Sequence, residues 1–202
     1  LNSDVWLSAQ SERFMALTLT SPSLKWVQSV TAGTDMPIFR QFEAKNICVV
    51  TSHVQSIAIA EFVLTRVLSY FQDERARHLA QAQREWKPKK FREIAGSRWL
   101  IVGFGAIGQD IAVRVNAFGG SVVGVRQNVS PHPLAERIIA LSDISAELPS
   151  TDVLVLCVPL SPQTEGLIGA EKLRQMKADA VLVNVGRGQL LDEDALMAAL
   201  AM

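Results

Sequence analysis

The segment Arg98-Trp99-Leu100-Ile101-Val102-Gly103-Phe104-Gly105-Ala106-Ile107-Gly108 joins a mostly apolar run of five residues to a Gly-x-Gly-x-x-Gly turn. A turn of this kind is common by itself, so the prediction rests on what surrounds it. Here the turn directly follows the apolar run, opens a helix over Ile107 to Phe118, and precedes a second apolar run over Ser121 to Val125. This order of strand, turn, helix and strand is what a dinucleotide-binding βαβ unit requires, and we predict a Rossmann unit here.

Each of the three glycines has a separate task in such a turn. Gly103 permits the tight bend after the strand, and Gly105 lacks the Cβ that would block the close approach of a pyrophosphate. Gly108 lets the new helix pack against the strand. The free N–H groups at the start of the helix then face the phosphate charge, so the turn predicts NAD(P) as the ligand.

The end of the second strand indicates which dinucleotide the unit prefers. An NAD-binding site usually places Asp or Glu there for the ribose hydroxyls, but this sequence reads Gly124-Val125-Arg126-Gln127-Asn128. Arg126 carries permanently charged, planar donors that attract a 2′-phosphate, so we predict a preference for NADP, with NAD possible. The competing interpretation is that Arg126 is a solvated surface residue.

Short apolar runs alternate with helical stretches along the rest of the chain. The other expected strands are Asp4 to Leu7, Leu24 to Gln28, Ile47 to Val50, Asp152 to Cys157 and Ala180 to Asn184. The other expected helices are an apolar one over Val54 to Tyr70, a polar one over Asp73 to Trp86, and one over Asp192 to Leu200 with Asp192 as its N-cap. This alternation predicts parallel sheets, and the charged connector Lys87 to Ser97 predicts a boundary between domains 1–90 and 91–202.

The overall composition narrows the classes of partner. Lys and Arg together number 20, as do Asp and Glu, so the net charge does not favour nucleic acid or an anionic membrane. No apolar run approaches the roughly 18 residues needed to span a bilayer, and we expect a cytoplasmic protein. Cys48 and Cys157 lie in apolar runs without metal-ligand or disulfide spacing, so we expect reduced core thiols and no metal site.

Further motifs point to a family. The segment Asn184-Val185-Gly186-Arg187-Gly188-Gln189-Leu190-Leu191-Asp192 resembles the Asn-x-x-Arg-Gly-x-x-x-Asp segment of the D-isomer-specific 2-hydroxyacid dehydrogenases. Supporting matches are Ala32-Gly33-Thr34-Asp35, the pair Ala60-Glu61, and Val158-Pro159-Leu160 with Thr164. The resemblance implies an α/β protein with a doubly wound parallel Rossmann sheet and a smaller, flavodoxin-like α/β substrate domain over 1–90. We expect both domains to be incomplete, because both ends of the sequence resemble truncations.

The resemblance also implies roles for particular residues. Arg187 would bind the substrate carboxylate and polarise the adjacent carbonyl, and its forked guanidinium suits a 2-oxo acid. Backbone amides at Gly33 and Thr34 would hold the carboxylate from the other domain. The alternatives are a structural ion pair for Arg187 and an ordinary turn at Gly33 and Thr34. Cofactor contacts are implied for Gly103, Gly105, Ala106, Ile107, Gly108, Arg126, Val158, Pro159, Thr164, Val185, Gly186 and Arg187.

The sequence departs from the family in its histidines. The family's proton-transferring histidine and its carboxylate partner lie beyond the arginine segment, whereas His53, His78 and His132 all precede it. We therefore expect the catalytic histidine outside this sequence. His132 is expected near the adenosine end of the cofactor, and the other two are expected to be structural.

The function that the resemblance implies is hydride transfer between NAD(P)H and a small 2-oxo or 2-hydroxy acid of the glyoxylate or hydroxypyruvate type. By the same resemblance, the helix over Val54 to Tyr70 and its polar successor over Asp73 to Trp86 would pack across the two-fold axis of a homodimer. The alternative is a helix buried within one subunit. Two alternatives stay open: a dinucleotide-sensing, corepressor-like interaction protein, and a dehydrogenase of the same fold that acts on phosphoglycerate, formate or phosphite.

Overall fold

The computed structural model describes residues 6–7, 18–29, 32–33 and 36–201, which belong to two compact units, Leu1–Ser56 and Ile57–Met202. The first unit is a small parallel sheet in the order β1 (Trp6–Leu7), β2 (Trp26–Ser29), β3 (Cys48–Val50). Helix α2 (Pro37–Ala44) begins with a proline, whose fixed φ suits a first helical turn. Apolar side chains from α2, β2 and the adjoining loops form the core of this unit: Leu24, Val27, Ile38, Phe39, Phe42 and Ile47.

One side chain of the first unit differs from the expectation. The prediction that Cys48 is a core residue is wrong, because its side chain is exposed and its thiol is free. Strand β3 pairs with β2 through one edge, and its three residues are exposed, half-buried and exposed in turn. The apolar run around Cys48 therefore reflects strand formation more than burial.

The second unit contains the predicted Rossmann sheet. Its strands are β4 (Arg98–Val102), β5 (Ser121–Val125), β6 (Arg137–Ile139), β7 (Val153–Leu156) and β8 (Val181–Asn184). They lie in the order β6-β5-β4-β7-β8, and every pair is parallel. The chain runs outward from β4 through β5 to β6, then crosses back to β7 on the other side of β4. This reversal makes the carboxyl ends of β4 and β7 the switch point where doubly wound folds bind their ligands.

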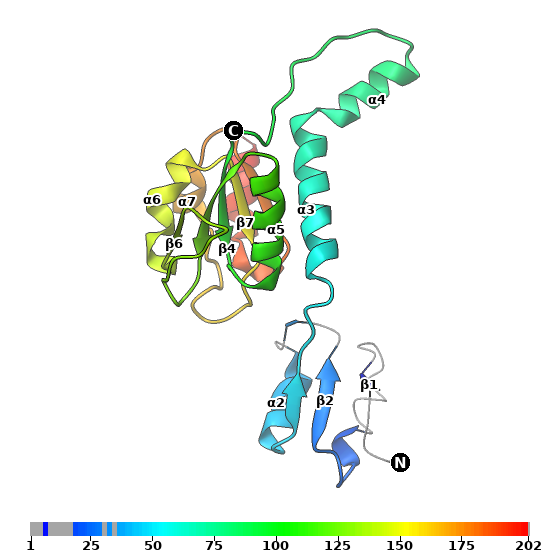
Figure 1. Cartoon of the computed structure of the whole chain (residues 1–202), viewed down its shortest axis with the longest axis vertical. Helices are drawn as coiled ribbons and strands as arrows, with labels where there is room; N and C mark the ends of the chain where they lie inside the picture. The colour runs from blue at the N-terminus through cyan, green and yellow to red at the C-terminus, as the bar shows by residue number, and fades with distance from the viewer. Residues whose placement is uncertain (1–5, 8–17, 30–31, 34–35, 202) are drawn as a thin grey trace. The chain divides into compact units, whose positions relative to one another are not determined.

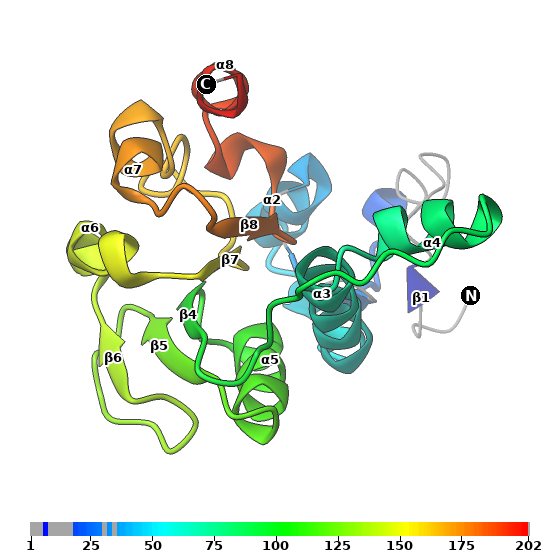
Figure 2. The ribbon, with the colours of Figure 1, turned by 90° about the horizontal axis from the view of Figure 1, so that it is seen from above.

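Helices cover both faces of this sheet, as Figures 1 and 2 show. Helices α3 (Ser56–Phe71) and α5 (Ala106–Ala117) lie on one face, while α6 (Ile144–Glu147) and α7 (Ala170–Gln175) lie on the other. Helix α8 (Glu193–Leu200) follows β8, and the prediction of Asp192 as its N-cap is confirmed, since Oδ1 accepts from Ala195 N at 3.0 Å. The short 3-10 helices are Leu141–Asp143, Leu148–Ser150 and Gly188–Leu190.

Alternate residues of each strand pack into the two hydrophobic cores, one on each face of the sheet. Trp99 and Ile101 of β4 pack with α3 and α5, whereas Leu100 and Val102 pack on the opposite face. This period of two is what a strand buried on both faces requires. Trp99 is fully buried, and its indole N–H donates to Ser97 Oγ at 2.9 Å.

Helix α3 explains where the compact units divide. Five of its side chains are buried in the core shared with β4 and α5, namely Ala60, Val63, Leu64, Val67 and Phe71. The division into compact units therefore falls before this helix, at Ser56 and Ile57. The sequence predicts a buried helix here, but only one face of α3 is buried. Phe62 and Tyr70 on other faces are 54% and 62% exposed.

The polar helix that follows is shorter than the sequence predicts. Helix α4 spans Glu74–Ala82 and does not reach Trp86. Arg84 adopts a left-handed conformation with φ of 55°, which an α-helix cannot continue. Every residue from Gln81 to Phe91 is exposed, and Trp86 is 92% exposed. Among the described residues, no helix is both long enough and apolar enough to cross a membrane.

Candidate active site

The glycine turn joins β4 to α5 at the carboxyl edge of the Rossmann sheet. Gly103 has a φ of +106°, and a Cβ on it would lie 2.5 Å from the carbonyl oxygen of Cys157. A Cβ on Gly108 would lie 2.3 Å from the carbonyl oxygen of Gly103. Both separations are far below any real contact, so the bend and the approach of α5 to β4 depend on glycine at these two positions.

The described part of the protein does not itself require a glycine at position 105. Its φ is −90°, and a Cβ on it would meet no atom within 4 Å. Gly105 is the N-cap of α5, and glycine has no side chain with which to cap the amides of the first turn, which includes Ala106 and Ile107. An open, positively polarised helix start is what a pyrophosphate needs, so these residues fit a dinucleotide.

Cys157 holds the same turn from the end of the neighbouring strand. Its thiol donates to the carbonyl oxygen of Gly103 at 3.0 Å. The N–H of the same peptide, which belongs to Phe104, donates to Val125 O at 2.9 Å. The peptide between Gly103 and Phe104 is therefore held on both sides, which fixes the direction in which the turn leaves β4. Burial raises the pKa of the Cys157 thiol to about 12, so the group stays a neutral donor.

Substitution of Cys157 tests this role. We expect Cys157→Ala to leave the Gly103 carbonyl without its donor and to lower the free energy of unfolding by about 1–3 kcal/mol. Cys157→Ser retains a donor and should lose less. Because the folded state raises the thiol pKa above its ordinary value of 9.0, the wild type should also lose stability as the pH rises from there towards 12. Urea unfolding at neutral and alkaline pH measures both effects, and an equal alkaline loss in all three proteins would contradict the second.

Arg126 lies directly after β5, on the same edge of the sheet. It is half-buried, and its guanidinium donates to the backbone oxygens of Asn128 and Ser130 at 2.8 and 3.1 Å. This end of the second strand is where dinucleotide-binding folds of this type hold the adenosine ribose. His132, a few residues on, packs edge to face against Phe104 of the glycine turn, with ring centroids 5.2 Å apart.

The loop after β7 is closed by Thr164. Its buried hydroxyl donates to Pro159 O at 2.8 Å and accepts from Ser161 N, also at 2.8 Å. The structure thus gives Thr164 a bracing role within the loop, and its contact with a cofactor stays a prediction. Val158 is half-buried and Pro159 exposed, and both follow β7 beside the glycine turn.

The segment after β8 is shaped by the side chain of Asn184. Its Oδ1 accepts from Gly186 N at 3.0 Å, and its Nδ2 donates to Arg187 O at 2.8 Å. A Cβ on Gly186 would lie 2.7 Å from Leu190 Cδ1 and 3.0 Å from Val158 O, so this turn packs tightly against the loop after β7. Val185, Gly186 and Arg187 are thereby held at the carboxyl edge of the sheet. The Arg187 side chain is half-buried and donates to Gly186 O at 3.0 Å.

The second unit therefore brings together all the predicted cofactor residues at one edge of its sheet, at the ends of β4, β5, β7 and β8. The predicted carboxylate-binding amides belong to the first unit. Gly33 is half-buried there, and Thr34 lies outside the described residues. His53 and His78 are both exposed, and the ring of His78 lies 3.2 Å from Glu74. Sequence reasoning missed Cys157 and Asn184 as supports of the site, because only strand pairing brings Cys157 to Gly103.

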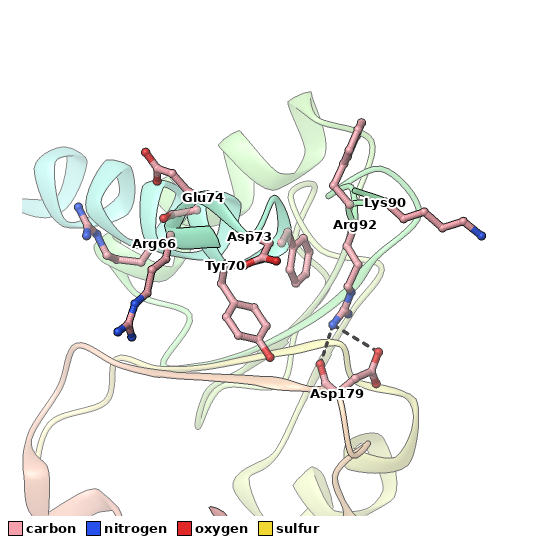
Figure 3. A pocket seen from close by; sticks show the side chains of 11 residues that line it. Arg66, Tyr70, Asp73, Glu74, Lys90, Arg92 and Asp179 are labelled. Carbon is pink, nitrogen blue, oxygen red and sulfur yellow. Dashed lines mark hydrogen bonds and ion pairs between the residues drawn. The ribbon is translucent and has the colours of Figure 1, made fainter. Parts of the chain in front are cut away.

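A cavity lies elsewhere on the second unit, away from the glycine turn. It has a volume of about 810 Å³, and Tyr70, Arg92 and Asp179 are among the side chains that line it (Figure 3). Arg92 Nη1 lies 3.3 Å from the Asp179 carboxylate, and the guanidinium stacks on Phe71 at 4.2 Å. Asp179 precedes the amino end of β8, so this cavity lies at the edge of the sheet opposite the glycine turn. Parallel sheets bind ligands at the carboxyl edge, and we do not assign the active site to this cavity.

Comparison with known proteins agrees with this architecture. The chain is 33% identical to a D-3-phosphoglycerate dehydrogenase of Methanocaldococcus jannaschii over 88% of its length and 34% of that protein's. It is also 33% identical to a glyoxylate reductase of Thermococcus kodakarensis, over 89% of this chain and 57% of the relative. A crystal structure of a D-isomer specific 2-hydroxyacid dehydrogenase from Xanthobacter autotrophicus in complex with NADPH and MES superposes with a TM-score of 0.79. That match has 27% identity and covers 98% of this chain and 62% of that one.

The chain thus spans between a third and three fifths of the length of these relatives. Residues 64–202 match the NAD binding domain of the D-isomer specific 2-hydroxyacid dehydrogenases, which is more than half of the chain. The matched range holds the glycine turn, Arg126 and the Asn184 to Arg187 segment. The chain belongs to the D-isomer specific 2-hydroxyacid dehydrogenase family.

Proposed function

We propose that the full-length protein is an NAD(P)-dependent oxidoreductase that interconverts a small 2-oxo acid and its 2-hydroxy acid, of the glyoxylate or hydroxypyruvate type. The observation that carries this proposal is the grouping of an open glycine turn and Arg187 at one edge of a single sheet. The relatives named glyoxylate reductase support the substrate class. The relatives named phosphoglycerate dehydrogenase favour a second candidate substrate, a phosphorylated hydroxy acid.

Each part of the site has a proposed task. The nicotinamide ring, when bound, supplies or accepts the hydride. The amides at Gly105, Ala106 and Ile107 hold the pyrophosphate, and the backbone at Val158 and Val185 borders the cofactor. Arg187 binds the substrate carboxylate through two parallel hydrogen bonds and draws electron density from the neighbouring carbonyl. Gly33 and Thr34 hold the same carboxylate from the substrate domain, proposed to span 1–90, and a histidine beyond Arg187 provides the proton.

Turnover by the full-length gene product tests the reaction. We expect NADPH oxidation with glyoxylate or hydroxypyruvate, and slower oxidation with 3-phosphohydroxypyruvate. Preferred turnover of the phosphorylated acid would select the second candidate substrate. Tight cofactor binding without turnover of any 2-oxo acid would overturn the enzymatic proposal and leave a dinucleotide-sensing protein.

The proposed cofactor preference is for NADPH, because Arg126 stands where a carboxylate would select NADH. We expect Arg126→Ala to weaken NADPH binding by about tenfold to a hundredfold, since a hydrogen-bonded charge pair is lost. NADH binding should change little. Isothermal titration of both cofactors measures this, and an equal loss for the two would contradict the assignment.

We also propose that the protein is a cytoplasmic homodimer that associates through α3 and the segment after α4. This region exposes Phe62, Tyr70, Trp86 and Phe91, each by more than half. We expect a mass of about twice 22.1 kDa for this chain in solution by light scattering. Phe62→Asp should produce monomers, whereas Leu200→Asp, on the exposed side of α8, should not. A monomeric wild type would refute the dimer.

A further inference from the structure

The loop after β5 binds the guanidinium of Arg126 along one side. Nε donates to Asn128 O at 2.8 Å, and Nη2 donates to both Ser130 O at 3.1 Å and Ser130 Oγ at 2.6 Å. Three acceptors on one short loop therefore hold Nε and Nη2. Among the described residues, Nη1 has no protein partner, so two of the five N–H donors of the side chain remain for a ligand.

Ser130 has a donor of its own to offer. A hydroxyl that accepts a hydrogen bond still carries its proton, and the 2.6 Å bond from Nη2 occupies only a lone pair of Ser130 Oγ. Ser130 is half-buried and precedes Pro131, and a residue before proline is restricted to extended conformations. The Ser130 hydroxyl and Nη1 are thus two donors that belong to one hydrogen-bonded pair of side chains, Ser130 and Arg126.

The charges nearby suit an anion better than a ribose hydroxyl. The first carboxylate after Arg126 in the sequence is Glu136, which pairs with Arg98 Nη1 at 3.5 Å. Residues 126–135 contain no acidic side chain that could accept from a 2′-hydroxyl or repel a phosphate. Phosphate oxygens accept such charge-assisted and hydroxyl hydrogen bonds strongly.

We propose that Ser130 is a specificity-determining residue for the dinucleotide. It orders the Arg126 guanidinium and donates its own proton to an oxygen of the 2′-phosphate. This inference rests on the proposed NADPH preference and adds to it a second residue, whose hydroxyl is a third acceptor beside the two backbone carbonyl oxygens that order Arg126 before the dinucleotide binds.

Three variants test the proposal by titration calorimetry. Ser130→Ala should weaken the binding of NADPH and of adenosine 2′,5′-bisphosphate by about tenfold, while NADH binding changes less than about twofold. Ser130→Thr keeps the hydroxyl and should retain most of the selectivity. Ser142→Ala removes an exposed serine hydroxyl that donates to its neighbour Asp143 at 3.0 Å, and should match the wild type. Thermal unfolding of each variant checks that the fold is intact.

The outcomes separate this inference from the proposed function. If Arg126→Ala abolishes the selectivity for NADPH but Ser130→Ala leaves it unchanged, the role of Ser130 is refuted and the cofactor preference stands. If Ser130→Ala weakens NADPH and NADH equally, the residue supports the fold and not the choice of cofactor, which also refutes the inference. A wild-type chain that binds neither dinucleotide overturns both the inference and the proposed function.

Discussion

Gly103→Ala is expected to lower the free energy of unfolding of the second unit by at least about 3 kcal/mol, because two penalties coincide. The new Cβ would lie 2.5 Å from the carbonyl oxygen of Cys157 and 2.8 Å from Val158 N, and both are backbone atoms held by the sheet. Alanine would also have to adopt a φ of +106°. Urea unfolding followed by circular dichroism measures the loss.

Gly105→Ala is the matched control in the same turn. Its Cβ would enter open space at an ordinary φ of −90°, so stability should change by less than about 1 kcal/mol. The same methyl group would occupy the place proposed for the pyrophosphate, so NADPH binding should weaken by about tenfold or more. Each factor of ten corresponds to about 1.4 kcal/mol of binding free energy. Equal destabilisation by the two substitutions would contradict the steric account of the turn.

The second large effect is expected at Arg187. Arg187→Gln should lower kcat/KM for the 2-oxo acid by a factor on the order of 10³. In the proposed site, the substrate carboxylate would lose a charged partner with two donors, and the carbonyl would lose its polarising group. Arg187→Lys keeps the charge without the fork and should recover only part of the activity. Steady-state kinetics of the full-length protein measures both variants.

Cofactor affinity distinguishes this role from a structural one. The backbone around Arg187 is shaped by Asn184, whose amide bonds Gly186 N and Arg187 O, so side-chain replacement should leave the turn in place. NADPH binding should therefore change by less than about threefold in both variants. Arg174→Gln, at an exposed position on α7, is the control for loss of a positive charge. Loss of cofactor binding together with activity would contradict a role confined to the substrate and would indicate that Arg187 supports the turn or contacts the cofactor.

The central strands of the Rossmann sheet could be predicted because each has a recognisable local sequence pattern. The apolar runs of β4, β5, β7 and β8 are buried or half-buried strands, and such runs next to glycine turns are recognisable without tertiary information. Strand β6 has three residues and lies at the edge of the sheet. Its first residue, Arg137, is exposed, and its sequence predicts no strand. The end of α4 depends on one residue, Arg84, whose left-handed φ has no sequence signal comparable to glycine.

The residues of the site likewise fall into those that the sequence could predict and those that it could not. Glycines and arginines could be identified from spacing, since their chemistry is specific to the residue type. The supports of the site could not, because they arise from strand pairing and loop closure. Cys157 reads as a core thiol until β7 is placed beside β4, and Ser130 reads as a loop residue until its bond to Arg126 is known. Cys48 shows the reverse error, in which an apolar neighbourhood does not imply burial.

Trp99 and Trp86 differ in burial, so their fluorescence can report separately on two parts of the second unit. The indole of Trp99 is sealed in the sheet and bonded to Ser97, whereas that of Trp86 is 92% exposed on the segment after α4. Iodide should therefore quench the emission of Trp86 and spare that of Trp99, whose shorter-wavelength light persists until the sheet opens. In a background where Trp6 and Trp26 are replaced by phenylalanine, one emission spectrum would follow both the integrity of the dinucleotide-binding sheet and the covering of the exposed segment.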